Sequence, residues 1–131
     1  MSEGSSSAPL TYSPERAAEF MRRGIKDAFL AVADDGQGGE IQGAIYGDVV
    51  EPWYTTDRMG LEHFLYVRPE HRAGRAALML IRAWTRWCGA SGPKQLRPAT
   101  AAKSPEADRL YRALGFEPVG TLFVMNQKDF P

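Results

Sequence analysis

Apolar and polar positions alternate along the chain with two different periods, which predict helices and strands in turn. Three segments, which begin near Ser13, Ala77 and Ser104, carry apolar residues at the three-and-four spacing of an amphipathic helix. Short apolar runs typical of strands lie at residues 29–33, 40–47, 64–67, 95–100 and 121–125. Because helices and strands alternate in the second half while hairpins flank them, we expect an α/β fold built on one mixed sheet.

The predicted helices carry recognisable ends and one apolar face each. Ser13 and Ser104 are each followed by Pro and Glu, which is the pattern of an N-cap and a first helical turn. Gly89 and Gly115 stand where the second and third helices should end. The residues expected to face the core are Ala77, Leu80, Ile81, Trp84 and Cys88 in the second helix, and Ala107, Leu110, Tyr111 and Leu114 in the third.

The segment between the central strand and the second helix has the composition of an anion site. The strand at 64–67 ends before Pro69, and a turn of small and basic residues at 71–77 leads into the helix. A helix N-terminus presents backbone N–H groups and the positive end of the helix dipole, and both favour a phosphate. Small side chains let phosphate oxygens approach the backbone, and Arg72 and Arg75 would neutralise their charge.

Two stretches of the chain resemble conserved motifs of the GNAT superfamily of N-acetyltransferases. Residues 67–72, Val-Arg-Pro-Glu-His-Arg, with the small Ala77 after them, resemble its acyl-CoA-binding signature, although Arg75 stands where a glycine is usual and Gly74 lies one place early. In residues 107–116 an alanine, a tyrosine, a glycine and a phenylalanine repeat the spacing of the family's later helix. The resemblance spans about residues 39–125. It implies a GNAT-like acyl-CoA N-acyltransferase fold that is shortened at its N-terminus, as in short bacterial or phage-borne members.

The resemblance also implies a cosubstrate and roles for particular residues. Acetyl-CoA would donate the acetyl group, and coenzyme A would be the product. The pantetheine arm would lie against the backbone of Leu65, Tyr66 and Val67 and the side chain of Ser104. The pyrophosphate would lie against the turn residues Arg72, Ala73, Gly74, Arg75, Ala76 and Ala77. Tyr111 would be the acid that protonates the leaving thiolate.

The general base is the least determined catalytic role. Glu62 stands on the central strand, where several members of the family place a glutamate. His63 is next to it, but the alternation of side chains along a strand directs it to the other face. Only one of them can face the substrate, and we assign the base to Glu62. Two alternatives stay open: Glu62 is a solvent-facing acid at a strand end, or an acceptor amine with a low pKa needs no base.

The segment from 49 to 59 is too irregular for a strand and combines aromatic and acidic residues. Glu51, Trp53 and Tyr54 are candidate substrate residues, because exposed aromatic rings beside carboxylates suit the rim of a pocket for a cationic amine. The alternative is a loop that its aromatic residues pin to the core. The sequence favours neither reading.

Composition and charge narrow the classes of partner. The chain has 131 residues with 16 Lys and Arg against 16 Asp and Glu, so no global field argues for a nucleic acid or a membrane surface. The single Cys88 excludes an internal disulfide and a multi-cysteine zinc site, and no metal is expected. Its position on the helix favours a small buried residue over a nucleophile.

Residues 1–12 begin with a Ser- and Gly-rich run, which predicts a disordered leader, and residues 13–131 are long enough for a single domain. No segment has the apolar length of a membrane span, and the leader lacks the apolar centre of a signal peptide. A cytoplasmic location is therefore expected.

Three functions remain open on the sequence. The first is acetyl transfer from acetyl-CoA to an amine, with a small amine, an aminoglycoside, a peptide N-terminus or a protein lysine as acceptor. The second is a GNAT-fold module that binds CoA or a protein without catalysis. The third is a nucleic-acid contact through the arginines of the central helix, which the balanced charge disfavours. A missing edge strand would also leave a sheet edge able to pair in a homodimer.

Overall fold

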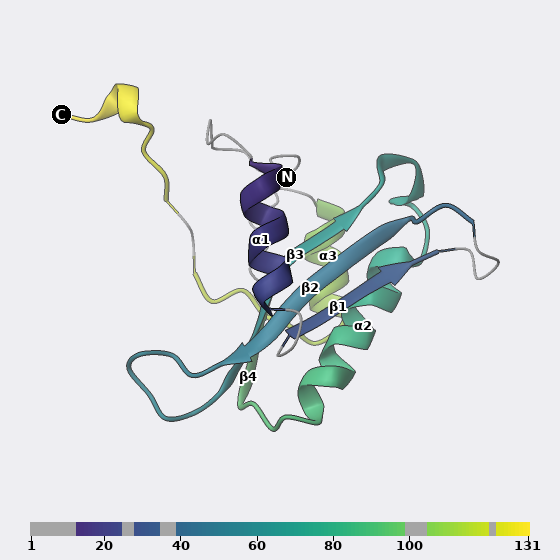
Figure 1. Cartoon of the computed structure of the whole chain (residues 1–131), viewed down its shortest axis with the longest axis horizontal. Coiled ribbons are helices and arrows are strands. Elements are labelled where there is room, and N and C mark those ends of the chain that lie inside the picture. The colour runs from purple at the N-terminus through teal and green to yellow at the C-terminus, as the bar shows by residue number, and fades with distance from the viewer. Residues whose placement is uncertain (1–12, 25–27, 35–38, 99–104, 121–122) are drawn as a thin grey trace. The chain divides into compact units, whose positions relative to one another are not determined.

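The computed structural model describes residues 13–24, 28–34, 39–98, 105–120 and 123–131. The chain divides into two compact units: Ala18–Thr100 forms the larger, and Met1–Ala17 together with Ala101–Pro131 forms the smaller. Figure 1 traces the chain from its N-terminus to its C-terminus. The predicted leader at 1–12, Ser104 and parts of two predicted strands, at 99–100 and 121–122, lie outside the described residues.

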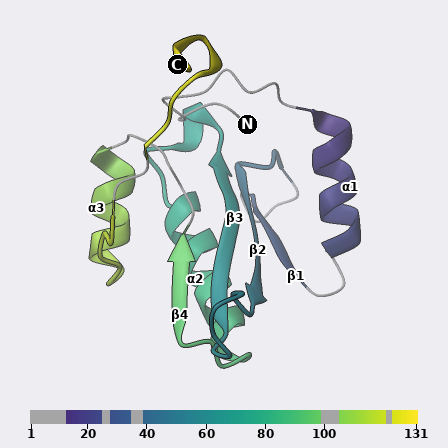
Figure 2. The ribbon, with the colours of Figure 1, turned by 90° about the vertical axis from the view of Figure 1, so that its left-hand side faces the viewer.

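The larger unit is built on a sheet of four strands in the order β1-β2-β3-β4. These strands are β1 (Ala28–Ala33), β2 (Gly43–Val50), β3 (Met59–Val67) and β4 (Gln95–Pro98). The first three are antiparallel neighbours, whereas β4 runs parallel to β3. Between β3 and β4 the chain forms a 3-10 helix, η1 (Pro69–His71), and helix α2 (Ala76–Gly89), which lies along one face of the sheet (Figure 2). The predicted mixed α/β sheet is confirmed.

Helix α2 buries its apolar stripe against that face. Its buried residues are Ala76, Leu80, Ile81, Trp84 and Cys88. The predicted stripe is thus confirmed except at its start: the helix begins one residue earlier, so Ala76 faces the core and Ala77 is half-exposed. The helix approaches the strands closely because glycines lie beneath it. A Cβ on Gly47 would lie 2.6 Å from Trp84 Nε1, and one on Gly60 would lie 2.9 Å from Cys88 Sγ.

The pairing of β2 with β3 contains one irregularity, at His63. Tyr46 is paired with Phe64 and Gly47 with Glu62, so His63 is the extra residue of a β-bulge. Because Gly47 lies over Trp84 of α2, the paired Glu62 faces α2 as well. Side chains alternate along a strand, so Tyr46 and Phe64 face the opposite side of the sheet.

Helix α1 (Pro14–Gly24) begins in the smaller unit and ends in the larger. The backbone N–H of Arg16 donates to Ser13 Oγ at 3.2 Å, which confirms the predicted N-cap. In the larger unit, the ring of Phe20 packs edge-on against Tyr46, with centroids 5.5 Å apart. Phe20 therefore marks the face of the sheet that α2 does not cover.

The smaller unit contains helix α3 (Pro105–Ala113). Gly115 ends it with φ of +96°, and the N–H of Phe116 donates to the carbonyl of Tyr111 at 2.9 Å, which confirms the predicted glycine stop. The predicted inner face of this helix is half-exposed rather than buried: Ala107, Leu110, Tyr111 and Leu114. Among the described residues, no helix combines the length and the apolar character needed to cross a membrane.

The strand predicted at 121–125 is wrong for the residues that are described there. Phe123, Val124 and Met125 have no strand conformation, and only a 3-10 helix, η2 (Gln127–Asp129), follows them. A strand needs a neighbour that takes up its N–H and carbonyl groups, and no described strand pairs with this segment. The apolar pattern alone was therefore insufficient to form a strand here.

Gly47→Ala should destabilise the protein, because the added methyl group would lie 2.6 Å from Trp84 Nε1 and 2.8 Å from the Leu61 carbonyl oxygen. Overpacking of this kind costs about 1–3 kcal/mol. The midpoint of urea unfolding measures the change. Gly89→Ala is the matched control: nothing lies within 4 Å of its Cβ position, and alanine in a helix should leave stability unchanged or raise it by up to about 1 kcal/mol. Equal midpoints for both variants would contradict the close contact of α2 with β2.

Candidate acetyl-CoA site

The turn after β3 is braced by Arg72. Its Nε donates to the carbonyl oxygen of Val67, the last residue of β3, at 2.8 Å. Its guanidinium carbon also lies 5.6 Å from the centroid of the Tyr66 ring, which is a cation–π distance. Arg72 thus ties the turn back to the strand and places a positive charge beside the predicted pyrophosphate position.

The N-terminus of α2 fits an anion. Its N-cap residue, Arg75, makes no side-chain capping bond, and the N–H of Met79 donates to the Arg75 carbonyl at 3.0 Å. The N–H groups of Ala76 and Ala77 precede that of Met79, which is the first to donate within the helix, so a ligand or solvent must satisfy them. A phosphate at this position would gain these donors and the helix dipole.

The departure from the family's glycine pattern causes no backbone strain. Arg75 has φ of −100° and ψ of 1°, a conformation that a residue with a side chain can adopt. Gly74 has no positive φ, and a Cβ there would meet only the His71 carbonyl oxygen at the ordinary distance of 3.4 Å. The turn therefore keeps its path with arginine at position 75. Ala73, Gly74 and Arg75 are exposed residues, so the backbone there is accessible.

One edge of β3 has no described partner strand beyond Glu62, and we call it the open edge. Among the described residues, the pairing of β3 with β4 ends at Glu62 and Pro98. On the other edge, the N–H of Arg68 donates to the Gln42 carbonyl in line with β2. Backbone groups alternate between the two edges of a strand, so those of Leu65 and Val67 point to the open edge. The same alternation directs the backbone groups of Tyr66 toward β2.

This open edge can accommodate an extended polar chain such as pantetheine. Leu65 and Val67 offer backbone groups there, although the Val67 carbonyl already accepts from Arg72. Tyr66 contributes its ring, over which the Arg72 guanidinium lies. The strand edge and the turn follow one another along the chain from β3 to α2, which is the arrangement that the predicted cofactor site requires.

Glu62 and His63 lie on opposite faces of the sheet, as the alternation predicted. Glu62 is only 1% exposed on the side of α2, so the alternative of a solvent-facing acid is wrong. His63 lies on the face with Phe20 and Tyr46, and its Nε2 is 3.0 Å from Asp48 Oδ1. Both side chains of this pair are 26% exposed. The sequence analysis missed Asp48 as the partner of His63.

Burial and a nearby carboxylate suppress ionisation around the sheet. Burial, with a further contribution from the charge of Asp48, raises the pKa of Cys88 to about 11. The pKa of Tyr46 is raised for the same two causes in the same order. Cys88 is fully buried and protonated, as expected for a packing residue, and is unsuited to act as a nucleophile.

The loop between β2 and β3 is exposed at its aromatic residues. Trp53 is 95% and Tyr54 58% exposed, and their rings contact each other at 5.5 Å. The alternative that these residues pin the loop to the core is therefore wrong. Glu51, Trp53 and Tyr54 line an open hollow of about 700 Å³. The loop lies at the end of β3 opposite the turn (Figure 1).

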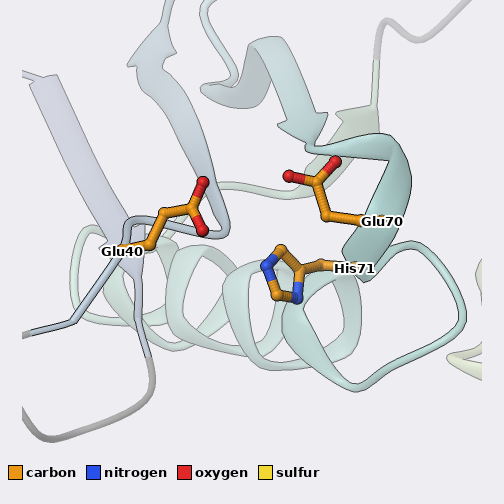
Figure 3. Close-up of side chains that lie close together, drawn as sticks. All are labelled: Glu40, Glu70 and His71. Carbon is orange, nitrogen blue, oxygen red and sulfur yellow. The ribbon is translucent and has the colours of Figure 1, made fainter.

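Three polar side chains gather beside the turn. Glu40, before β2, and Glu70 and His71, in η1, bring ligand atoms within 4.8 Å of one another (Figure 3). Arg68 Nη1 lies 2.8 Å from Glu40 Oε1, so an arginine already supplies positive charge to this cluster. The ion pair between Glu40 and Arg68 links the segment before β2 to the residue that follows β3. Its position could not be foreseen from the sequence.

Tyr111 belongs to the smaller unit. It is half-exposed on α3, and its ring meets that of Phe116 edge-on at 5.7 Å. This contact accompanies the helix stop at Gly115 and fixes the direction of the tyrosine relative to its own helix. Its role as the acid stays a prediction, as does the role of Ser104.

Comparison with known proteins identifies the family. The chain matches the profile of the acetyltransferase (GNAT) family over residues 4–116. Among solved structures, an acetyltransferase from Trypanosoma brucei is similar at 16% identity and a TM-score of 0.69, over 95% of this chain and 86% of that chain. An aminoglycoside 6'-N-acetyltransferase from Acinetobacter haemolyticus is similar at 18% identity and 0.66, over 90% and 83%. None of the curated proteins compared with the chain matches it.

A glucosamine-6-phosphate N-acetyltransferase from Arabidopsis thaliana shares the fold at 14% identity and a TM-score of 0.69, over 90% of this chain and 82% of that chain. The chain thus belongs to the GNAT acetyltransferase family. It is an acyl-CoA-dependent N-acyltransferase, and acetyl-CoA is its cosubstrate; one aminoglycoside N-acetyltransferase of this fold was solved in complex with CoA. The match begins at residue 4 and ends at 116, so the expected span of 39–125 is corrected at both ends.

Arg72→Ala should weaken CoA binding, because it removes the bond to the Val67 carbonyl and a positive charge at the turn. Loss of one charge-assisted contact corresponds to roughly a tenfold to hundredfold rise in Kd. Isothermal titration calorimetry measures the change. Arg82→Ala removes the same charge from the exposed side of α2, beyond its first turn, and should leave Kd unchanged. Equal affinities for the two variants would mean that the turn is not the pyrophosphate site.

Proposed function

We propose that this chain transfers an acetyl group from acetyl-CoA to a primary amine by direct attack of the neutral amine. The observation that carries the proposal is the N-terminus of α2, which has no side-chain cap and follows a strand whose far edge has no partner beyond Glu62 among the described residues. The first feature suits a pyrophosphate and the second suits an amide-containing arm. A protein that only contacted nucleic acid through its arginines would need neither.

The proposed reaction assigns each residue one task. Bound acetyl-CoA supplies the activated thioester. The turn residues Arg72 to Ala77 hold its phosphates, and the backbone groups of Leu65 and Val67 orient its arm along β3. A backbone N–H at this edge would donate to the oxygen of the reacting carbonyl, where negative charge develops. Tyr111 would return a proton to the leaving sulfur.

The acceptor is proposed to be a small amine or an amine on a larger molecule. Two of the similar structures are named for aminoglycoside and glucosamine-6-phosphate acetylation, so amines on sugars belong in a first panel. We propose Glu51, Trp53 and Tyr54 as the residues that meet the distal part of the acceptor. Exposed aromatic rings beside a carboxylate attract a cation through the ring faces and the negative charge.

The experiment that tests the function is a panel of amines with acetyl-CoA, read out by free thiol release, beside a calorimetric titration of CoA. The panel contains aminoglycosides, amino sugars, simple alkylamines and lysine peptides. Saturable thiol release that depends on one amine class supports the proposal. Tight CoA binding without release on any class contradicts it, and would indicate a GNAT-fold module that binds CoA without catalysis.

Tyr111→Phe should lower kcat much more than CoA affinity, because the variant keeps the ring against Phe116 and loses only the hydroxyl. Loss of a general acid costs roughly 10²-fold or more in rate. Steady-state thiol release and calorimetric Kd are measured side by side. Tyr111→Leu, which also removes the ring contact, separates an effect of packing from an effect of the hydroxyl. Full activity of Tyr111→Phe would remove Tyr111 as the acid.

A further inference from the structure

We propose that His63 is the catalytic base of the acetyl transfer and that the acceptor amine approaches the face of the sheet opposite α2. Asp48 is its positioning residue. This inference rests on the proposed function, because it assigns the group that takes the proton from the attacking amine. It replaces Glu62 in that role with a residue that the β-bulge brings to the accessible face.

The bulge places His63 at the level of the sheet where the reaction should occur. Glu62 and Pro98 are the last described pair of β3 and β4, and the open edge of β3 begins after that pair. His63 is the next residue along β3. With its phosphates at the turn, acetyl-CoA would extend its pantetheine arm along the open edge toward the pair of Glu62 and Pro98. The reacting end of that arm would therefore lie beside His63. The register shift between Tyr46 and Gly47 makes His63 an extra residue at this level.

Asp48 prepares His63 to act as a base. His63 Nε2 lies 3.0 Å from Asp48 Oδ1, and an ionised carboxylate can only accept a hydrogen bond. The neutral ring must therefore carry its proton on Nε2 and donate it to Asp48, which leaves the lone pair on Nδ1. When Nδ1 takes a proton, the same carboxylate stabilises the imidazolium that forms. The pair thus has the geometry of an oriented base.

The surroundings hold the ring in place without enclosing it. Phe20 contacts His63 edge-on at 5.1 Å, and the Tyr46 ring lies 5.6 Å away. His63 and Asp48 are each 26% exposed, and Phe20 is 50% exposed. An amine with an apolar body could lie against the open side of Phe20 and reach the imidazole. Glu62 is 1% exposed on the α2 side and has no such access.

The proton balance of the step is complete. The amine nitrogen forms a bond to the thioester carbon while the C–S bond breaks, and one N–H proton passes to Nδ1 of His63. The thiolate receives a proton from the general acid, and solvent restores both groups afterwards. Among the residues that the structure describes, the titratable groups with a ring contact or hydrogen bond to His63 are Asp48 and Tyr46 from β2. From α1 it is faced by Phe20, which does not titrate.

The kinetic test compares His63→Gln with His71→Gln at the chain's other histidine. The His71 ring lies beside Glu40 and Glu70 (Figure 3). Glutamine at position 63 can still donate to Asp48 but accepts no proton, so kcat should fall roughly 10²-fold or more with the KM for acetyl-CoA unchanged. The acidic limb of the pH–rate profile should also be absent in His63→Gln, because the variant has no imidazole to protonate. His71→Gln should keep kcat and the acidic limb, and any loss should fall on the KM for acetyl-CoA, because His71 lies at the start of the turn that is proposed to hold the cofactor. Imidazole added to His63→Ala should restore part of the rate.

Asp48→Asn tests the positioning role with a readout that needs no turnover. In the free wild-type protein, nitrogen-detected NMR of the His63 ring should show the neutral tautomer with its proton on Nε2. In Asp48→Asn the preference for this tautomer should weaken and the acidic limb of the rate profile should move. A wild-type ring protonated on Nδ1 would overturn the role of Asp48.

The outcomes separate this inference from the function on which it rests. A wild-type protein that releases no thiol with any amine removes the proposed function, and the role of His63 falls with it. Normal thiol release by His63→Gln, with the acidic limb intact, removes His63 and leaves acetyl transfer standing. In that case a loss of rate in Glu62→Gln, with the unfolding midpoint unchanged, would return the role to Glu62.

Discussion

The unequal pairing of β3 on its two edges is the constraint on which the rest of the site depends. β3 is hydrogen-bonded to β2 along its whole length, except for the bulge, and within the described part of the chain its pairing with β4 ends at Glu62. One edge is therefore fixed, while the other offers backbone groups beyond that point. A rigid strand with an open edge can position an extended ligand without help from long side chains. Both the predicted arm site and the bulge lie on this strand.

Helix α2 places its N-terminus at one end of the open edge of β3, so the two ends of that edge differ. Its buried stripe fixes the helix against the sheet, and the glycines beneath Trp84 and Cys88 allow the close approach. This packing holds the first turn of the helix at the end of β3, where Arg72 joins the turn to Val67. The positive end of the helix dipole thus lies at one end of the open edge. The buried core and the anion site are produced by the same contact.

Local patterns predicted those parts of the structure that depend on neighbours in sequence. The stripe of α2, the cap at Ser13 and the stop at Gly115 follow from side chains within a few residues of one another. The bulge at His63 could not be read in this way, because a one-residue shift is decided by how two strands pair. The strand predicted at 121–125 is absent from the described residues 123–125 for a related reason, since a strand depends on a partner. The position of Asp48 beside His63 likewise follows from strand pairing rather than spacing.

Amide chemical shifts during a titration of CoA into isotope-labelled protein test the central claim most directly, because they locate the ligand residue by residue without turnover. The account predicts that the largest shifts fall on Leu65 and Val67 and on the turn at 73–77. It predicts no shift in the loop at 51–58, at the other end of β3. Shifts confined to that loop, or spread over the arginines on the exposed side of α2, would contradict the assignment of the site to the open edge and the helix N-terminus.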